Sequence, residues 1–198
     1  MKDSFVEKRY SRTHHAGRRN FLIQTAVGGS GLILGLYLPQ IARADASFVP
    51  EMNAWIVIKP DDTVIIRMAR TEMGQGTLTG LAQLVAEELD TPPDLFEVVF
   101  APADTQYRNR DYGLQLTGGS NSLSTSWQVL RETGALAKIM LLNAASDVFQ
   151  VPVEHLEIDN KYVVLKGSTK KISFGELASL ASKQSAPSPI PLKNKADF

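Results

Sequence analysis

The chain of 198 residues has no cysteine and only three histidines, two of which, His14 and His15, lie in a basic N-terminal stretch. The absence of cysteine excludes disulfides, thiolate zinc sites and any iron–sulfur cluster held by this chain alone. His155 is the one histidine in the rest of the sequence, so a metal held by a cluster of His and Cys side chains is not expected. Any metal that the protein uses would therefore be carried by another molecule.

The formal net charge of zero hides an asymmetry along the chain. The first 44 residues hold seven Lys or Arg and two acidic residues, while the remainder holds 14 basic and 19 acidic residues. Nucleic acids bind basic protein faces, so a mildly acidic body argues against nucleic acid as a partner.

Residues 1–44 have the order of an export signal. The paired Arg18 and Arg19 precede an uncharged, apolar stretch over 23–41, and an Ala-x-Ala site ends at Ala44. This pattern predicts a twin-arginine (Tat) signal peptide, an address rather than part of the fold, and a periplasmic protein exported by the Tat translocase. That route moves folded proteins, which favours a protein that receives a cofactor before export. The alternative is a membrane anchor, and an uncleaved leader would act as one.

Residues 45–184 are predicted to form one domain, whose elements follow from periodicity and turn signals. The predicted strands are 55–58, 63–68, 96–100, 156–158 and 162–165, and turn signals at 60–62 and 159–161 predict two hairpins among them. The predicted helices are 78–89, a long one that begins near Ser122 or Ser124, either of which could be its N-cap, and 174–181 with Ser173 as its cap. Gly134 inside the long helix indicates close packing against another backbone. The fold class is α+β, a small mixed sheet with hairpins that is covered on one face by two longer helices. Residues 185–198 are Ser/Pro/Lys-rich and are interpreted as a linker to a missing domain.

A glycine-rich loop from Glu72 to Thr77 lies between a predicted strand and a predicted helix. Gly74 and Gly76 let the backbone approach a ligand closely, and Gln75 offers both a donor and an acceptor. The amides at the following helix start favour anions. Taken alone, such a loop is usually only a turn, and this one matches neither a Walker A loop nor a Rossmann fingerprint.

A second glycine-rich segment, Thr117 to Ser122, opens the long helix. Gly118, Gly119 and the hydroxyls of Ser120 and Ser122 at a helix N-terminus suit a phosphate or pyrophosphate. An N-cap is the simpler interpretation if the segment stood alone. Two helix starts of this kind in one small domain favour a phosphate-bearing ligand.

Both segments resemble ordered motifs of the xanthine dehydrogenase/aldehyde oxidase family. The residues that carry the resemblance are Met73-Gly74-Gln75-Gly76 with Thr79 and Ala86-Glu87-Glu88-Leu89, and Thr117-Gly118-Gly119-Ser120-Asn121-Ser122 with Trp127, Arg131 and Gly134-Ala135. The similarity is greatest to the branch with the isoquinoline 1-oxidoreductase beta subunit and exported aldehyde dehydrogenases, which also carry Tat leaders. It covers residues 53–198 and corresponds to the N-terminal portion of a molybdopterin-binding large subunit.

The resemblance implies a molybdenum–molybdopterin cofactor in its cytosine dinucleotide form, with the metal held by the pterin's dithiolene sulfurs. It implies that Gly74, Gln75 and Gly76 contact the molybdopterin end. It places Gly118, Gly119, Ser120 and Ser122 along the cofactor's phosphates or pterin. Asn121 stands where the family commonly has another small hydroxyl residue, which leaves the role of this side chain open.

The family's reaction is oxidative hydroxylation, here of aldehydes or N-heterocycles, with water as the oxygen source. Its general base is a glutamate in a downstream Gly-Val-Gly-Glu-like motif that is absent from this sequence. No catalytic residue is therefore expected in this chain, and Glu72 is interpreted as structural. The implied partners are the remaining domains of the large subunit and an iron–sulfur small subunit or a cytochrome.

Three hypotheses stay open at this point. The chain is the first domain of an exported molybdenum hydroxylase, or a stand-alone module that binds a pterin or nucleotide-like ligand without chemistry, or a non-catalytic truncated product. The third hypothesis predicts a large exposed apolar face on the long helix.

Overall fold

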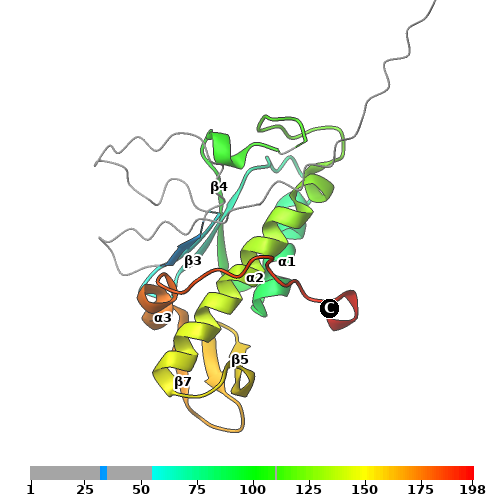
Figure 1. The fold of residues 1–198 in the computed structure, drawn as a ribbon. Helices are drawn as coiled ribbons and strands as arrows, with labels where there is room; N and C mark the ends of the chain where they lie inside the picture. Colours follow the sequence, from blue (N-terminus) through cyan, green and yellow to red (C-terminus); the bar gives the residue numbers. More distant parts are fainter. Residues whose placement is uncertain (1–31, 35–54, 110) are drawn as a thin grey trace, which may run out of the picture.

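The computed structural model describes residues 32–34, 55–109 and 111–198 of the chain (Figure 1). The strands are β1 (Leu32–Leu34), β2 (Ile56–Ile58), β3 (Val64–Met68), β4 (Phe96–Phe100), β5 (Leu156–Asp159), β6 (Tyr162–Leu165) and β7 (Lys171–Ser173). The helices are α1 (Thr77–Leu89), α2 (Ser122–Phe149) and α3 (Phe174–Ala181), with 3-10 turns at Pro93–Leu95, Thr105–Tyr107, Val153–His155 and Lys195–Asp197. The fold class is α+β, as predicted.

The first sheet has the strand order β1-β2-β3-β4. The β2–β3 hairpin forms around the predicted turn at 60–62, where Asp62 adopts a positive φ of 65°. Strands β3 and β4 are parallel, and α1 makes the crossover between them, so the sheet is mixed. Val64, Ile66 and Met68 point into the core with the predicted period of two.

Strand β1 was not predicted, because residues 1–44 were interpreted as an export signal outside the fold. Leu32–Leu34 pairs antiparallel with β2, and Leu32 is fully buried. The pairing brings together segments more than twenty residues apart, which local patterns do not reveal. The rest of 1–44 lies outside the described residues, and its assignment as a leader stays a prediction.

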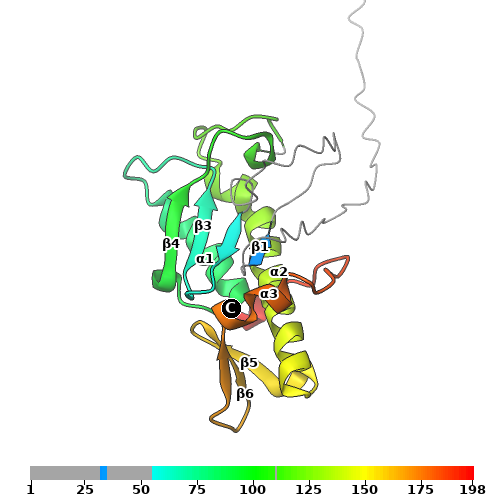
Figure 2. The same ribbon diagram turned by 90° about the vertical axis from the view of Figure 1, so that its left-hand side faces the viewer.

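Helices α1 and α2 lie on the same face of the first sheet (Figure 2). They run in the same direction, because Leu123 meets Gly80 near the helix starts and Lys138 pairs with Asp90 at the end of α1. Between these points the helices approach most closely at Gly134, where a Cβ atom would lie 2.6 Å from the backbone oxygen of Val85. The predicted close packing at this glycine is confirmed.

Helix α2 has 28 residues and carries the chain about 40 Å along its axis. The predicted second hairpin, β5–β6, therefore does not join the first sheet and pairs instead with β7 in an antiparallel sheet of its own. The capping serine predicted for α3 is confirmed: Ser173 and Glu176 form a reciprocal capping box.

The turn of the β2–β3 hairpin, in the first sheet, makes hydrogen bonds to α3 and to the second sheet. The Asp62 carboxylate accepts a hydrogen bond of 2.6 Å from the Gly175 amide at the start of α3. The Asp62 carbonyl accepts one of 2.8 Å from Lys161 Nζ in the β5–β6 turn.

None of the helices in the described part of the chain is long and apolar enough to span a membrane.

The Gly134→Ala variant tests the close approach of α1 and α2. We expect it to lower the free energy of unfolding by about 1–3 kcal/mol, because the added methyl meets backbone atoms that do not move aside easily. Denaturant unfolding measures the change.

Gly80→Ala is the matched control, since its Cβ would lie 3.0 Å from a methyl of the half-exposed Leu123 side chain, which can rotate away. Its better helix propensity makes the control neutral or stabilising by up to about 1 kcal/mol. Equal stabilities of the two variants would contradict the packing argument.

Candidate functional site

The two glycine-rich segments of the sequence lie together at one end of the molecule. Residues 71–76 follow β3 and lead into α1, and residues 117–121 lead into α2. The Thr71 amide donates a hydrogen bond of 2.7 Å to Thr117 Oγ1, which joins the two segments directly. This contact places the segment with Gly74, Gln75 and Gly76 and the segment with Gly118, Gly119, Ser120 and Ser122 at the same end of the molecule.

The start of α1 is closed by a carboxylate of the chain itself. Glu72 Oε1 accepts hydrogen bonds from the amides of Gly74 at 2.8 Å and Gly76 at 3.0 Å, and Oε2 accepts one from Leu78 at 3.0 Å. Glu72 thus compensates the positive end of α1. An anionic ligand cannot bind these amides unless it displaces Glu72.

The same hydrogen bonds decide what Glu72 can do chemically. The amides of Leu78 and then Gly76 hold the pKa of the Glu72 carboxyl below its usual value of 4.5. A group that stays a bonded carboxylate at neutral pH is a weak base. The structure therefore supports a structural role for Glu72.

Gln75 is folded back onto its own loop. Its Oε1 accepts from the Met73 amide at 2.6 Å, and its Nε2 donates to the Thr71 carbonyl at 2.9 Å. The side-chain amide still has one free N–H and one free lone pair, so it can meet a ligand without breaking the loop.

The start of α2 differs from that of α1 because it is open. Gly119 and Ser120 have positive φ values of 62° and 53°. Helix α2 begins at Ser122 with Asn121 as the N-cap, so neither Ser122 nor Ser124, the two predicted caps, is the N-cap. The Asn121 side chain makes no capping hydrogen bond, and its Oδ1 is buried without a partner. Within the described residues, no side chain accepts a hydrogen bond from the first amides of α2, from Ser122 to Ser124. Ser122 itself is buried.

Arg70 is the functional candidate that the sequence analysis missed. It directly precedes the first glycine-rich segment, is only 3% exposed, and donates a hydrogen bond of 3.0 Å to Thr125 Oγ1 in the first turn of α2. Its signal in the sequence is the period of two in β3, since Arg70 continues the buried register of Met68. A charged residue at a buried position of this kind often marks a functional site.

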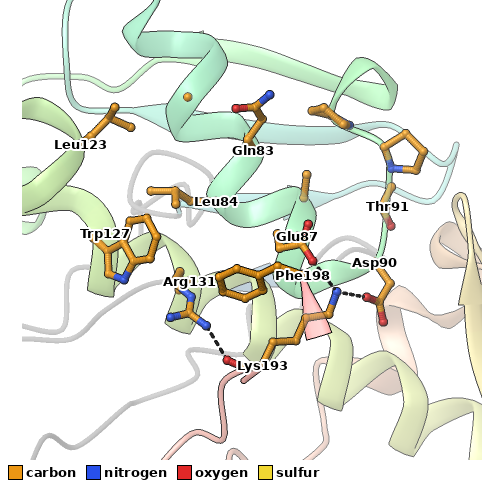
Figure 3. Close-up of a pocket in the computed structure, with 14 residues that line it drawn as sticks. Gln83, Leu84, Glu87, Asp90, Thr91, Leu123, Trp127, Arg131, Lys193 and Phe198 are labelled. Carbon is orange, nitrogen blue, oxygen red and sulfur yellow. Dashed lines mark hydrogen bonds and ion pairs between the residues drawn. The ribbon is translucent and has the colours of Figure 1, made fainter. Parts of the chain in front are cut away.

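A separate pocket of about 660 Å³ lies between α1, α2 and the C-terminal residues (Figure 3). The Arg131 guanidinium stacks between the rings of Trp127, at 5.5 Å, and Phe198, at 4.9 Å. It also bonds to the buried Glu88 at 2.6 Å and to the Lys193 carbonyl at 2.8 Å. None of the predicted site residues lines this pocket.

The charges of this pocket are paired with one another. Lys193 Nζ lies 2.9 Å from Glu87 and 2.5 Å from Asp90, and its amide bonds to Glu88 at 3.0 Å. These contacts hold part of the predicted linker, 185–198, against α1 and α2. The pocket is a packing feature with satisfied charges, whereas the open start of α2 is the better candidate for a ligand site. Within the described ranges, no group of three His, Asp or Glu side chains is arranged to hold a metal ion.

Comparison with known proteins identifies the family to which the chain belongs. The chain belongs to the molybdopterin cofactor-binding domain family, whose sequence model matches residues 4–198. This confirms the family resemblance and the molybdopterin type of cofactor.

The chain is 33% identical over 174 residues to the beta subunit of isoquinoline 1-oxidoreductase from Brevundimonas diminuta, which covers 84% of this chain. It is 27% identical over 172 residues, or 82% of the chain, to a protein of Gluconacetobacter polyoxogenes. That protein is named membrane-bound aldehyde dehydrogenase (pyrroloquinoline-quinone). The chain spans 22% and 21% of the lengths of these two oxidoreductases. Among solved structures it is similar to quinoline 2-oxidoreductase from Pseudomonas putida 86, with 18% identity over 69% of this chain and 17% of the other, and a TM-score of 0.48.

Glu72→Gln tests the closed start of α1 through the pH dependence of stability. A carboxyl whose pKa is lowered in the folded state stabilises the fold fully above its usual value of 4.5, and this contribution is lost as the pH falls through the lowered pKa. We expect wild type to be the more stable protein at neutral pH and the difference to shrink in the acidic range, as measured by denaturant unfolding.

Glu97→Gln is the control, because the Glu97 side chain is exposed on β4 and makes no hydrogen bond to the described residues. A difference between wild type and Glu72→Gln that stays constant with pH would contradict the role of the carboxylate.

Proposed function

We propose that this chain is the N-terminal cofactor-binding part of an exported molybdenum hydroxylase that oxidises aldehydes or N-heterocycles. The observation that carries the proposal is the pair of glycine-rich segments, joined by the Thr71–Thr117 hydrogen bond, with an open helix start at α2. Membership of the molybdopterin cofactor-binding domain family supports it.

The residues at this end of the molecule fit a phosphate-bearing cofactor. The first amides of α2 provide donors for a phosphate, and Gly118 leaves space, since a Cβ there would come no closer than 4.0 Å to Leu116. Gly74, Gln75 and Gly76 contact the molybdopterin end, and Gly118, Gly119, Ser120 and Ser122 border the phosphates or pterin.

The bound cofactor, in its cytosine dinucleotide form, supplies the oxidation chemistry in which water is the oxygen source. The described residues of this chain bind and orient it, while the general base belongs to the rest of the large subunit. An iron–sulfur small subunit or a cytochrome accepts the electrons. Export uses the Tat translocase and delivers the protein to the periplasm, and a leader that stays uncleaved attaches it to the membrane.

Metal and pterin analysis of the protein, purified from a molybdate-fed host that makes the cofactor, tests the proposal. We expect molybdenum and pterin near one per chain, either for the chain alone or when the remaining large-subunit polypeptide is co-expressed. Pyrroloquinoline quinone is assayed in the same sample, because one relative carries that name. Pyrroloquinoline quinone in place of pterin, or no cofactor in either expression, would overturn the proposal.

Gly118→Ala tests the site itself. The added methyl has room in the ligand-free chain, so stability should match wild type, but it intrudes where the ligand approaches the backbone. We expect cofactor binding to weaken roughly tenfold or more, comparable to the loss of one or two ligand hydrogen bonds. Cofactor content after dialysis is measured, with Lys183→Met as the control, at an exposed position that follows α3 and lies away from the loops. Full cofactor content in the Gly118→Ala protein would rule out close approach at this glycine.

A further inference from the structure

Arg70 carries a buried charge that the described part of the chain does not compensate. The side chain is 3% exposed; Nη2 donates to Thr125 Oγ1 at 3.0 Å and Nη1 to the Ala69 carbonyl at 3.5 Å, while Nε has no partner. No carboxylate among the described residues pairs with it. Burial lowers the pKa of Arg70 from 12.5. A guanidinium nevertheless remains charged at physiological pH.

The position of this charge makes the absence of a counterion more unfavourable. Thr125, the partner of Arg70, donates its own hydroxyl hydrogen to the Asn121 carbonyl at 2.7 Å, which places Arg70 behind the first turn of α2. The N-terminus of a long helix carries about half a positive charge. A buried cation and the positive end of α2 therefore face each other across one hydroxyl group.

The other charged features of the fold are arranged differently. The start of α1 has the Glu72 carboxylate, and the buried Glu88 has Arg131. At the start of α2 the positive charge accumulates, and no side chain of the described residues accepts a hydrogen bond from the amides of Ser122 to Ser124. An unpaired buried cation is unfavourable unless an opposite charge completes the site.

We propose that Arg70 is a positioning residue for a phosphate or pyrophosphate group at the start of α2. The anion binds the amides of the first turn, and the positive charge of Arg70 behind that turn acts on it through Thr125. Arg70 does not touch the ligand, because it is buried beneath the loops. It also links the segment after β3 to α2, so that anion binding stabilises both glycine-rich segments together. This inference rests on the proposed function for the identity of the ligand, but the anion site itself is tested separately.

Inorganic pyrophosphate added to the full chain is the probe, and thermal unfolding and titration calorimetry are the measurements. We expect pyrophosphate to raise the Tm of wild type, since a ligand that binds only the folded state stabilises it. Arg70→Met removes the charge but keeps an unbranched apolar side chain. It should match or exceed the ligand-free Tm of wild type and bind pyrophosphate roughly tenfold more weakly, the size of one charge-assisted interaction. Lys183→Met, at an exposed position two residues after the end of α3, removes the same formal charge and should bind as wild type does.

Thr125→Val is the second variant, because it keeps the shape of the side chain and the charge of Arg70 but removes the hydroxyl that joins Arg70 to α2. It should also weaken pyrophosphate binding, and it decides the question if Arg70→Met does not fold. Unchanged pyrophosphate affinity in the folded variants, or no effect of pyrophosphate on wild type, would overturn the inference.

Cofactor content of the wild-type chain separates this inference from the proposed function. A chain that carries molybdopterin but binds pyrophosphate independently of Arg70 rejects the role of Arg70 alone. A chain whose pyrophosphate binding depends on Arg70 but that never acquires molybdopterin rejects the proposed cofactor and leaves the anion site standing.

Discussion

The close approach of α1 and α2 at Gly134 is the constraint on which the rest of the structure depends. Because the Gly134 Cα faces the backbone of Val85 directly, the two helices pack without an intervening side chain. The helices run in the same direction, so their N-termini lie at the same end of the molecule. Both glycine-rich segments must then lie side by side, although more than forty residues separate them in the sequence.

Because the N-termini of α1 and α2 lie at one end of the molecule, two positive dipole ends lie there, and only that of α1 is compensated by an acidic side chain. Glu72 closes the start of α1 with a carboxylate that accepts three amide hydrogen bonds. At the start of α2 the chain offers no acid among its described residues and instead places Arg70 behind the first turn. The result is one site compensated by the protein and one that an anionic ligand would complete. A domain that binds a phosphate-bearing cofactor requires this second kind of site.

The C-terminal residues stabilise the same helix pair from outside. Arg131 on α2 and Glu88 on α1 form a buried ion pair across the helix interface, and Lys193 adds two acidic partners on α1 and its C-cap. The exposed apolar side chains of Leu123 and Trp127 lie beside this contact, on the outer surface of α2 (Figure 3). The chain spans about a fifth of the length of the relatives from Brevundimonas diminuta and Gluconacetobacter polyoxogenes.

The sequence by itself determined the elements that depend on neighbouring residues. The hairpin turn at 60–62, the cap at Ser173 and the extents of β2 to β6 and of α1 follow from interactions over a few positions, and such interactions are visible as patterns. Strands β1 and β7 are too short to show such a pattern and were not predicted. The motifs around Gln75 and Gly119 also identified the family, because their order along the chain is distinctive.

Tertiary structure alone decided how these elements pair and which residues surround the two helix starts. The pairing of β1 with β2, the separate sheet of β5–β7 and the Thr71–Thr117 hydrogen bond join residues from about ten to more than forty positions apart, and no local pattern specifies them. The sequence suggested two equivalent anion sites, but only the folded chain places Glu72 on the amides of α1 and leaves those of α2 open. Arg70 has a functional meaning for the same reason: a charge becomes significant when the surrounding fold buries it and the described residues provide no opposite charge.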